Sequence, residues 1–239
     1  MEKSSKFKFL LPIRSIMFIL IFVIGAWITK NKVSDISNWW SIVASVVNII
    51  TIIILVIVAK KMKITYSKLI NYEKGKTKVK QVIIVSLIVL VFASIGMNIA
   101  GLICYGVIPY AAPMMAEPIP VALAIINFII LPLTIPFAED GLYLGGGVNS
   151  FKNKYLAVLV PAFFYALQHS FIPVLFDVKF IIYRFICFLP LTIILCFYYY
   201  KKRNPVPVMI GHALVEMASV ILVLVTSISP EIYASWINM

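Results

Sequence analysis

Long runs of apolar residues limit the possible folds of this chain more than any other feature. Seven such blocks occur, at about 10–29, 40–59, 81–109, 119–147, 155–171, 178–200 and 205–228. Roughly 20 apolar residues in a helix span a bilayer, whereas a barrel strand needs only about 9–11. Backbone polar groups in lipid must also pair within their own segment, as they do in a helix. The sequence therefore predicts an all-α fold: a polytopic transmembrane helix bundle of about seven to eight helices in a single transmembrane domain, 1–239.

Composition excludes several other classes of protein. Hydrophobic residues make up 62% of the chain and charged residues 13%, and the mean hydropathy is +1.03. A soluble domain is about 45–50% apolar and about 25% charged, so a conventional soluble enzyme and a disordered chain are both excluded. The three cysteines (Cys104, Cys187 and Cys196) lie inside apolar blocks without CxxC spacing. This placement favours small buried side chains over a disulfide or a metal site.

The positions of the basic residues indicate an orientation. The net charge of +12 suggests a nucleic-acid partner when taken alone. However, most Lys and Arg residues lie in short loops beside apolar blocks, as in the cytoplasmic loops of membrane proteins. With the amino terminus inside, seventeen of them, Arg14 included, fall in inner segments and three in outer segments. We therefore predict a multi-pass plasma-membrane protein with a cytoplasmic amino terminus that contacts membrane lipid and no nucleic acid.

Six ionisable side chains lie in apolar surroundings: Glu139, Asp140, His169, Arg184, His212 and Glu216. Because a charge at bilayer depth costs several kcal/mol, such residues face a bundle interior or a wet cavity. At 1.5 Å per residue, the nearest inner-loop basic residue lies roughly 20 Å from Glu139 and roughly 22 Å from His169. On the last helix it lies roughly 14 Å from His212 and roughly 20 Å from Glu216. Three helices thus carry polar groups to a similar depth, which predicts one shared site.

Helical geometry narrows how these groups meet. His212 and Glu216 are four residues apart and share one helix face. Glu139 and Asp140 point about 100° apart, so only one of them aims squarely at a common centre. Arg184 is interpreted as the counter-charge of a buried acid. Simpler readings remain open: each histidine could be a hydrogen-bonded structural residue, and the two adjacent acids could lie at the inner interface.

Three short motifs give the chain a resemblance to a known family. They are EDGLYL at 139–144, YALQH at 165–169 and HALVE at 212–216. In their order and spacing they resemble the CPBP family, the CAAX proteases and bacteriocin-processing intramembrane proteases related to the Rce1-type endopeptidase. That family carries Glu-Glu-x-x-x-Arg, Phe-x-x-x-His and His-x-x-x-Asn or Asp on three transmembrane helices. The resemblance covers about 117–220, the motif-bearing core.

This resemblance implies an intramembrane endopeptidase with a catalytic set of Glu139, Asp140, His169, His212 and Glu216. In such a site, Glu139 and His169 hold a water molecule and take its proton, while His212, with Glu216, donates to the substrate carbonyl oxygen. The implied partner is a small membrane-associated peptide or a lipidated protein substrate, as in bacteriocin processing. The implied mechanism needs no cofactor. Two histidines and two acids could also hold zinc, although the sequence has no H-E-x-x-H helix.

Four positions depart from the family pattern. Asp140 and Tyr165 are mild changes, whereas Leu144 replaces the motif's arginine and Glu216 replaces a neutral amide. The last two favour the main alternative, a catalytically inactive member that serves as a bacteriocin-immunity or membrane scaffold protein. A transporter is a further alternative, because buried acids and histidines also line ion pathways. No internal repeat supports that last interpretation.

Overall fold

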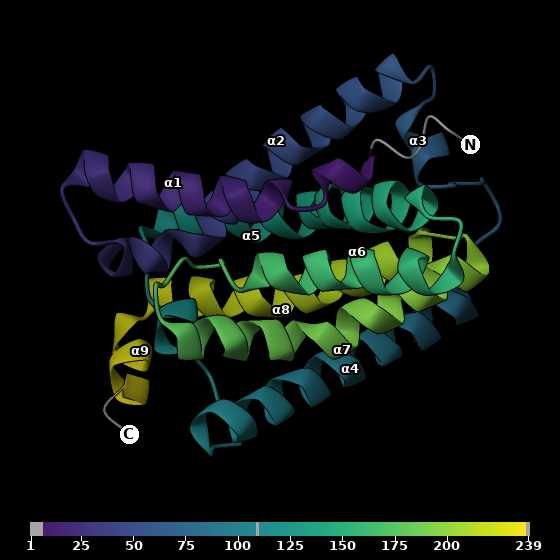
Figure 1. Ribbon diagram of the computed structural model, residues 1–239. Helices are drawn as coiled ribbons and strands as arrows, with labels where there is room; N and C mark the ends of the chain where they lie inside the picture. The colour runs from purple at the N-terminus through teal and green to yellow at the C-terminus, as the bar shows by residue number, and fades with distance from the viewer. Residues whose placement is uncertain (1–6, 109, 238–239) are drawn as a thin grey trace.

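The computed structural model describes residues 7–108 and 110–237, and every regular element in these ranges is a helix (Figure 1). The all-α prediction is therefore confirmed. Lys3 and Lys6, which belong to the predicted inner basic residues, and Pro109, in the third apolar block, lie outside these ranges. In chain order the elements are α1 (Ile13–Thr29), η2 (Val33–Trp39), α2 (Trp40–Lys61), α3 (Tyr66–Leu69), α4 (Val79–Tyr105), η3 (Pro113–Met115), α5 (Val121–Ile135), η4 (Pro136–Gly147), η5 (Val148–Ser150), α6 (Lys154–His169), α7 (Val178–Lys202), α8 (Val206–Ile228) and α9 (Pro230–Ile237).

Six helical stretches of the described chain are long and apolar enough to cross a membrane, where the sequence predicted seven spans. The difference lies at α6, which takes the place of the predicted block at 155–171. Its 16 residues measure about 24 Å at 1.5 Å per residue, less than the roughly 30 Å of hydrocarbon in a bilayer. Pro190 does not divide the sixth block, because α7 continues through it. The chain is thus a multi-pass membrane protein in which one short helix ends inside the bundle.

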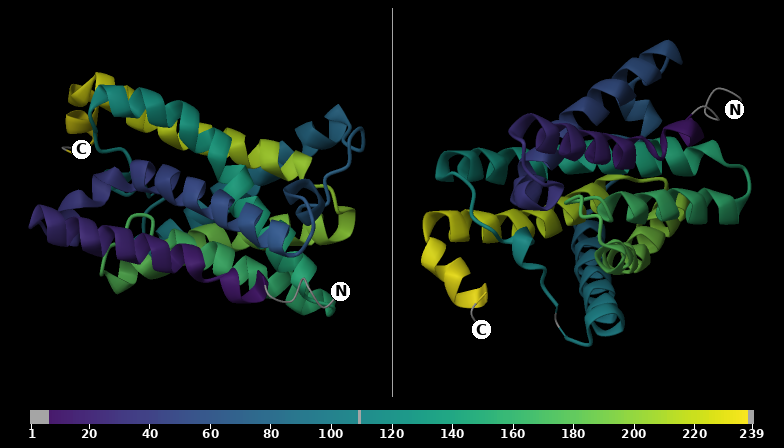
Figure 2. Two further views of the ribbon diagram at one scale, coloured as in Figure 1. Left: turned by 90° about the horizontal axis from the view of Figure 1, so that it is seen from above. Right: turned by 60° about the vertical axis from the view of Figure 1, so that its left-hand side comes forward.

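The long helices pack as an antiparallel bundle (Figures 1 and 2). α7 packs against α4 and α6, α8 packs against α4 and α5, and α1 and α2 contact α6 and α5 respectively. The connections that follow α2, η5 and α7 gather at the end of the bundle marked by α3 in Figure 1. The lysine-rich segments at 60–80, 152–154 and 201–203 lie at this same end. The basic residues are therefore concentrated on one side of the bundle.

Two glycines let α4 approach its neighbours closely. A Cβ atom at Gly96 of α4 would overlap the backbone oxygen of Cys187 on α7. A Cβ atom at Gly211 of α8 would lie 3.1 Å from the Ser86 Cα atom of α4. Small residues at such contacts are the usual basis of close helix packing in membranes. The position of α8, which carries His212, therefore depends on a glycine contact next to that histidine.

Replacing Gly96 with leucine is expected to separate α4 from α7. Overpacking of this kind costs about 1–3 kcal/mol, so the midpoint of thermal unfolding of the purified protein should fall. The matched control is Ile95→Leu, at a neighbouring position of α4 whose side chain is exposed on the bundle surface. Equal midpoints for the two variants would show that the α4–α7 contact does not need a glycine.

The fourth membrane-crossing stretch changes from an α-helix to a π-helix just before the acidic pair. η4 begins at Pro136, which has no backbone N–H to donate to the preceding turn. All residues of η4 except Phe137 are buried. π-helical turns are rare and occur mostly at functional sites. η4 brings its two acids into the bundle interior, between α2, α6 and α8.

Candidate active site

Glu139 lies at the centre of the buried polar side chains. Its Oε2 atom lies 3.6 Å from Nε2 of His169 and 3.9 Å from Nε2 of His212. Within the described ranges, Oε2 accepts no hydrogen bond, whereas Oε1 accepts one of 2.7 Å from Arg14. One carboxylate oxygen is therefore held in place, and the other faces two imidazole rings, one from α6 and one from α8.

Asp140 contacts the opposite side of the His212 ring. Its Oδ2 atom lies 3.4 Å from Nδ1 of His212, and its Oδ1 atom accepts a 3.0 Å hydrogen bond from the Tyr165 hydroxyl. A carboxylate beside one ring nitrogen fixes the proton on that nitrogen, so we assign a proton to Nδ1. Helical geometry predicted that only one of the two acids would aim at the centre. Both reach the site, because an imidazole has two nitrogens and each acid faces a different one.

Arg14 of α1 is a member of this cluster that sequence analysis missed. It was counted among the inner basic residues, yet its side chain is fully buried. Besides its bond to Glu139, it donates three hydrogen bonds: to Gln168 Oε1 (2.5 Å), Thr51 Oγ1 (3.0 Å) and Asn48 Oδ1 (2.8 Å). The signal that could have found it is its place inside the apolar block at 10–29, the same signal that singled out the six ionisable residues in the later blocks.

His169 sits at the carboxyl end of α6, where ring stacking and a neighbouring arginine fix its position. Its ring stacks on Phe188 of α7, with centroids 3.6 Å apart and planes 6° apart. Arg184 donates from Nε to the backbone oxygen of His169 (3.2 Å), which also accepts from the Ile172 N–H (3.3 Å) just beyond the end of the helix. No described carboxylate lies within ion-pair distance of Arg184, but Glu216 lines the same cavity, so the interpretation of Arg184 as a counter-charge stays a prediction. The cation beside Glu139 is Arg14.

A small cavity of about 60 Å³ adjoins Glu139 and His169. Arg184 and Glu216 also line it, and so does Trp40, whose indole N–H has no partner among the described residues. Glu216 shares the α8 face with His212, as predicted from their spacing, but it makes no hydrogen bond to His212 within the described chain. The partners of the His212 ring are Asp140 and Tyr165. The structure thus brings Glu139, Asp140, His169 and His212 into contact and places Glu216 farther out, on the cavity wall.

The three motifs therefore meet at one site. The sequence was compared with models of known protein families to ask what kind of site this is. Residues 121–218 match the family described as Type II CAAX prenyl endopeptidase Rce1-like. This segment, somewhat less than half of the chain, is similar to the CAAX protease family. Neither a curated protein nor a solved structure matches the chain. The matched segment contains all three motifs, whereas Arg14 lies outside it.

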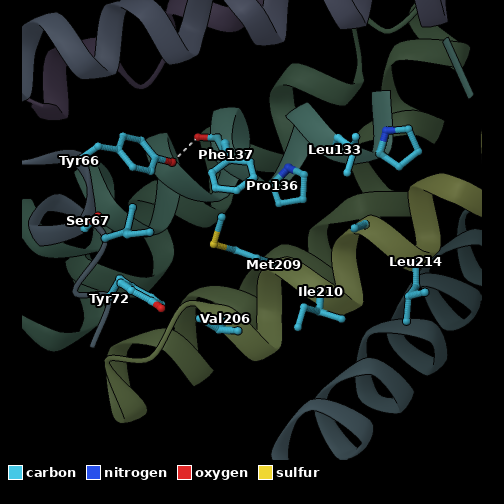
Figure 3. A pocket seen from close by; sticks show the side chains of 13 residues that line it. Tyr66, Ser67, Tyr72, Leu133, Pro136, Phe137, Val206, Met209, Ile210 and Leu214 are labelled. Atoms are coloured by element: carbon cyan, nitrogen blue, oxygen red, sulfur yellow. Dashed lines mark hydrogen bonds between the residues drawn. The ribbon is translucent and has the colours of Figure 1, made fainter. Parts of the chain in front are cut away.

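The chain has a second, larger hollow next to the polar cluster (Figure 3). This apolar groove, of about 510 Å³, runs along the seam between α5 with η4 on one side and α8 on the other. These are the elements that carry Glu139 and His212. Figure 3 shows Pro136 of η4 facing Met209 of α8 across the groove. The groove thus lies on the outer side of the same pair of elements whose inner side holds the polar cluster.

Tyr66 of α3 stands at one end of the groove. Its hydroxyl donates a 2.5 Å hydrogen bond to the backbone oxygen of Phe137 (Figure 3). Burial raises the pKa of the Tyr66 phenol, so the hydroxyl stays neutral and keeps this bond. Because Phe137 is two residues before Glu139, the short helix α3 of the lysine-rich loop is tied to the element that carries the central acid.

Proposed function

We propose that the chain is an intramembrane endopeptidase that hydrolyses a peptide bond with water activated by Glu139 and His169. The observation that carries this proposal is the Oε2 atom of Glu139, which is buried between two imidazole nitrogens without a hydrogen-bond donor. A buried polar atom without a partner is rare and needs an explanation. The adjoining cavity of about 60 Å³ has room for a water molecule, which takes up about 30 Å³ in the liquid.

In the proposed reaction the water oxygen forms a bond to the carbonyl carbon of the substrate. Its proton passes to Oε2 of Glu139, and His169 orients the water through a second hydrogen bond. The electron pair of the C=O double bond moves to the carbonyl oxygen. When the C–N bond then breaks, Glu139 returns the proton to the leaving nitrogen. A positioned general base and acid of this kind contributes about 10²–10⁴-fold to a rate.

His212 is the proposed donor to the negatively charged oxygen that develops on the substrate. Asp140 faces Nδ1 of His212 and stabilises a positive charge on the ring, so Nε2 is free to donate on the side of Glu139. Tyr165 donates to Asp140 and keeps that carboxylate in place. Donors aimed at a developing oxyanion are usually the largest single contribution to acyl-transfer catalysis. Asp140 and Tyr165 thereby take the orienting role first assigned to Glu216.

The proposed substrate is a membrane-bound peptide or lipidated protein whose apolar chain lies in the groove of Figure 3. The groove is bounded by the two elements that carry Glu139 and His212, so a chain lying in it would be held beside the site. Its lining is almost wholly apolar, which suits a hydrocarbon chain or apolar side chains and excludes a polar segment. Lys68 lies on the same short helix as Tyr66, so the end of the groove at Tyr66 is on the basic side of the bundle.

Filling the groove is expected to weaken substrate binding without changing the chemistry. Ile210→Trp, on the groove wall of α8, should raise KM by about tenfold and leave kcat nearly unchanged, because uniform binding is lost. The control is Ile221→Trp, on an exposed part of the same helix outside the groove. Steady-state kinetics on a cleaved peptide measure both values. Equal KM values for the two variants would place the substrate elsewhere.

A non-catalytic role as an immunity or scaffold protein remains the second candidate. It is favoured by Leu144, an apolar residue at the position of the motif arginine, and by the acid Glu216 on the cavity wall. In that case the biological function would survive Glu139→Ala and His169→Ala at normal protein levels. The proposed endopeptidase predicts that both substitutions abolish it.

The test of the proposed function is incubation of the purified protein with a panel of lipidated and leader-bearing peptides. Mass spectrometry should find new peptide ends with the wild type and none with Glu139→Gln. A zinc mechanism is the alternative for the same residues, so the wild type is also assayed after exhaustive chelation. Retained cleavage is expected from a glutamate mechanism. Identical product profiles for the wild type and Glu139→Gln would contradict the proposal.

A further inference from the structure

We infer that Arg14 completes the site: it is a positioning residue that keeps Glu139 ionised and aims its second carboxylate oxygen at the two histidines. The inference concerns a residue of the first helix, outside the segment matched to the Rce1-like family. Its consequence for the reaction rate rests on the proposed function. Its consequence for the protonation of Glu139 rests on the geometry alone and is tested separately.

The ion pair between Arg14 and Glu139 is completely removed from solvent. Nη2 of Arg14 lies 2.7 Å from Oε1 of Glu139, and both side chains have no exposed surface. An isolated ionised carboxylate is very costly to bury, and such a group takes up a proton instead. A cation at hydrogen-bonding distance offsets much of that cost when its remaining donors are also bonded, as those of Arg14 are. Arg14 therefore allows an ionised Glu139, which is the form that can accept a proton from water.

The orientation of Arg14 is fixed independently of Glu139. Its guanidinium is planar and holds its donors in a rigid fork. Three further acceptors use that fork: Gln168 on α6, and Thr51 and Asn48 on α2. Because the guanidinium is held by residues of two other helices, its bond to one oxygen of Glu139 fixes the orientation of the whole carboxylate group. Oε1 is bound by Arg14, so Oε2 is the oxygen left facing the histidines.

No other described arginine or lysine has this relation to Glu139, whose second oxygen faces the imidazoles of His169 and His212. Leu144, at the position where the resemblance led us to expect an arginine, is apolar and fully buried. Arg184 lines the same cavity but directs its Nε atom to the backbone oxygen of His169. Among the described residues, Arg14 is the arginine within ion-pair distance of Glu139. The first helix is thus part of the site and not only a membrane anchor.

The first test needs no substrate. Infrared spectra are compared for the purified wild type, Arg14→Met, Glu139→Gln and the double variant Arg14→Met/Glu139→Gln. Arg14→Met should show the carbonyl band of a newly protonated carboxyl group, because the acid has lost its counter-charge. The double variant should lack that band, which assigns it to Glu139. Spectra of Arg14→Met and the wild type that agree in this band would overturn the inference.

The second test uses a peptide that the wild type cleaves. Arg14→Met is expected to lower kcat by about 100-fold, because a positioned general base contributes about 10²–10⁴-fold and Glu139 loses the group that positions it, and to leave KM within about threefold. Arg14→Lys keeps the charge but not the fork, so its kcat should lie between those of Arg14→Met and the wild type. It also serves as the variant more able to fold if Arg14→Met is not recovered.

A control separates this role from a general effect on stability. Asn127 of α5 accepts a buried 2.5 Å hydrogen bond from Ser45 of α2, and no described hydrogen bond links either residue to Arg14 or Glu139. Asn127→Ala should lower the unfolding midpoint and leave kcat unchanged. A kcat loss in Arg14→Met no larger than that in Asn127→Ala would overturn the inference, even if Glu139→Gln abolishes cleavage. If the wild type cleaves no peptide, the proposed function fails and the infrared test still decides the role of Arg14.

Discussion

Glu139→Gln is expected to lower the rate of peptide cleavage by about 1000-fold or more, which corresponds to about 4 kcal/mol of transition-state stabilisation. An amide has almost the shape of a carboxyl group, but its nitrogen and oxygen do not take a proton from water at neutral pH. The loss should therefore appear in kcat, while KM changes little because Glu139 does not line the apolar groove. Quantifying the product peptide by mass spectrometry over time measures both constants.

The substitution also affects the fold, and a second variant separates the two effects. Glu139→Gln leaves the fully buried Arg14 without its acid, and an unpaired buried charge costs about 3–5 kcal/mol. Arg14→Met/Glu139→Gln removes both charges together and should restore the unfolding midpoint towards that of the wild type. The double variant is expected to be folded and inactive. Cleavage at the wild-type rate by either variant would rule out Glu139 as the base.

His169→Gln is expected to lower kcat by about 100-fold or more, because it removes the imidazole that orients the attacking water. The Nε2 atom of His169 lies 3.6 Å from Oε2 of Glu139, the shorter of the two imidazole distances. Glutamine fills much of the same space and keeps a polar end, so the loss should reflect the missing ring nitrogen. The measurement is again the rate of product formation on a peptide that the wild type cleaves.

Two control variants address the surroundings of His169. Phe188→Leu removes the stacked ring but no proton-transfer group, so its rate should fall by less than about tenfold. Glu216→Gln changes another acid on the cavity wall and should also have a small effect, since Glu216 makes no described bond to His212. A larger rate loss in Glu216→Gln than in His169→Gln would reverse the roles assigned to these two residues.

Hydropathy alone predicted the class of fold and six of the membrane-crossing stretches. It overestimated α6, because the block predicted at 155–171 has nearly the length of this 16-residue helix, which is too short to cross the hydrocarbon of a bilayer. It did not predict the π-helix η4. In a segment that is buried on nearly every side, apolar residues show no period that distinguishes one kind of helix from another. The change of helix type depends on Pro136 and on the packing around it.

The site was predictable where a charge stood out from apolar surroundings. Glu139, Asp140, His169 and His212 were identified in this way, and their depth along three chain segments predicted that they would lie close together. Arg14 was not identified in this way, because a basic residue near the start of a span usually marks the cytoplasmic side and was counted as such. Its burial depends on contacts with α2 and α6, which sequence spacing cannot provide.

The most direct test of the central claim is peptide cleavage in ¹⁸O-labelled water by the chelated, purified protein. If Glu139 and the two histidines activate one water molecule inside the bundle, the new carboxyl end of the product carries one ¹⁸O atom, and the Glu139→Gln protein forms no such product. Product that forms at the same rate with Glu139→Gln, or a peptide end released without label, would contradict the account.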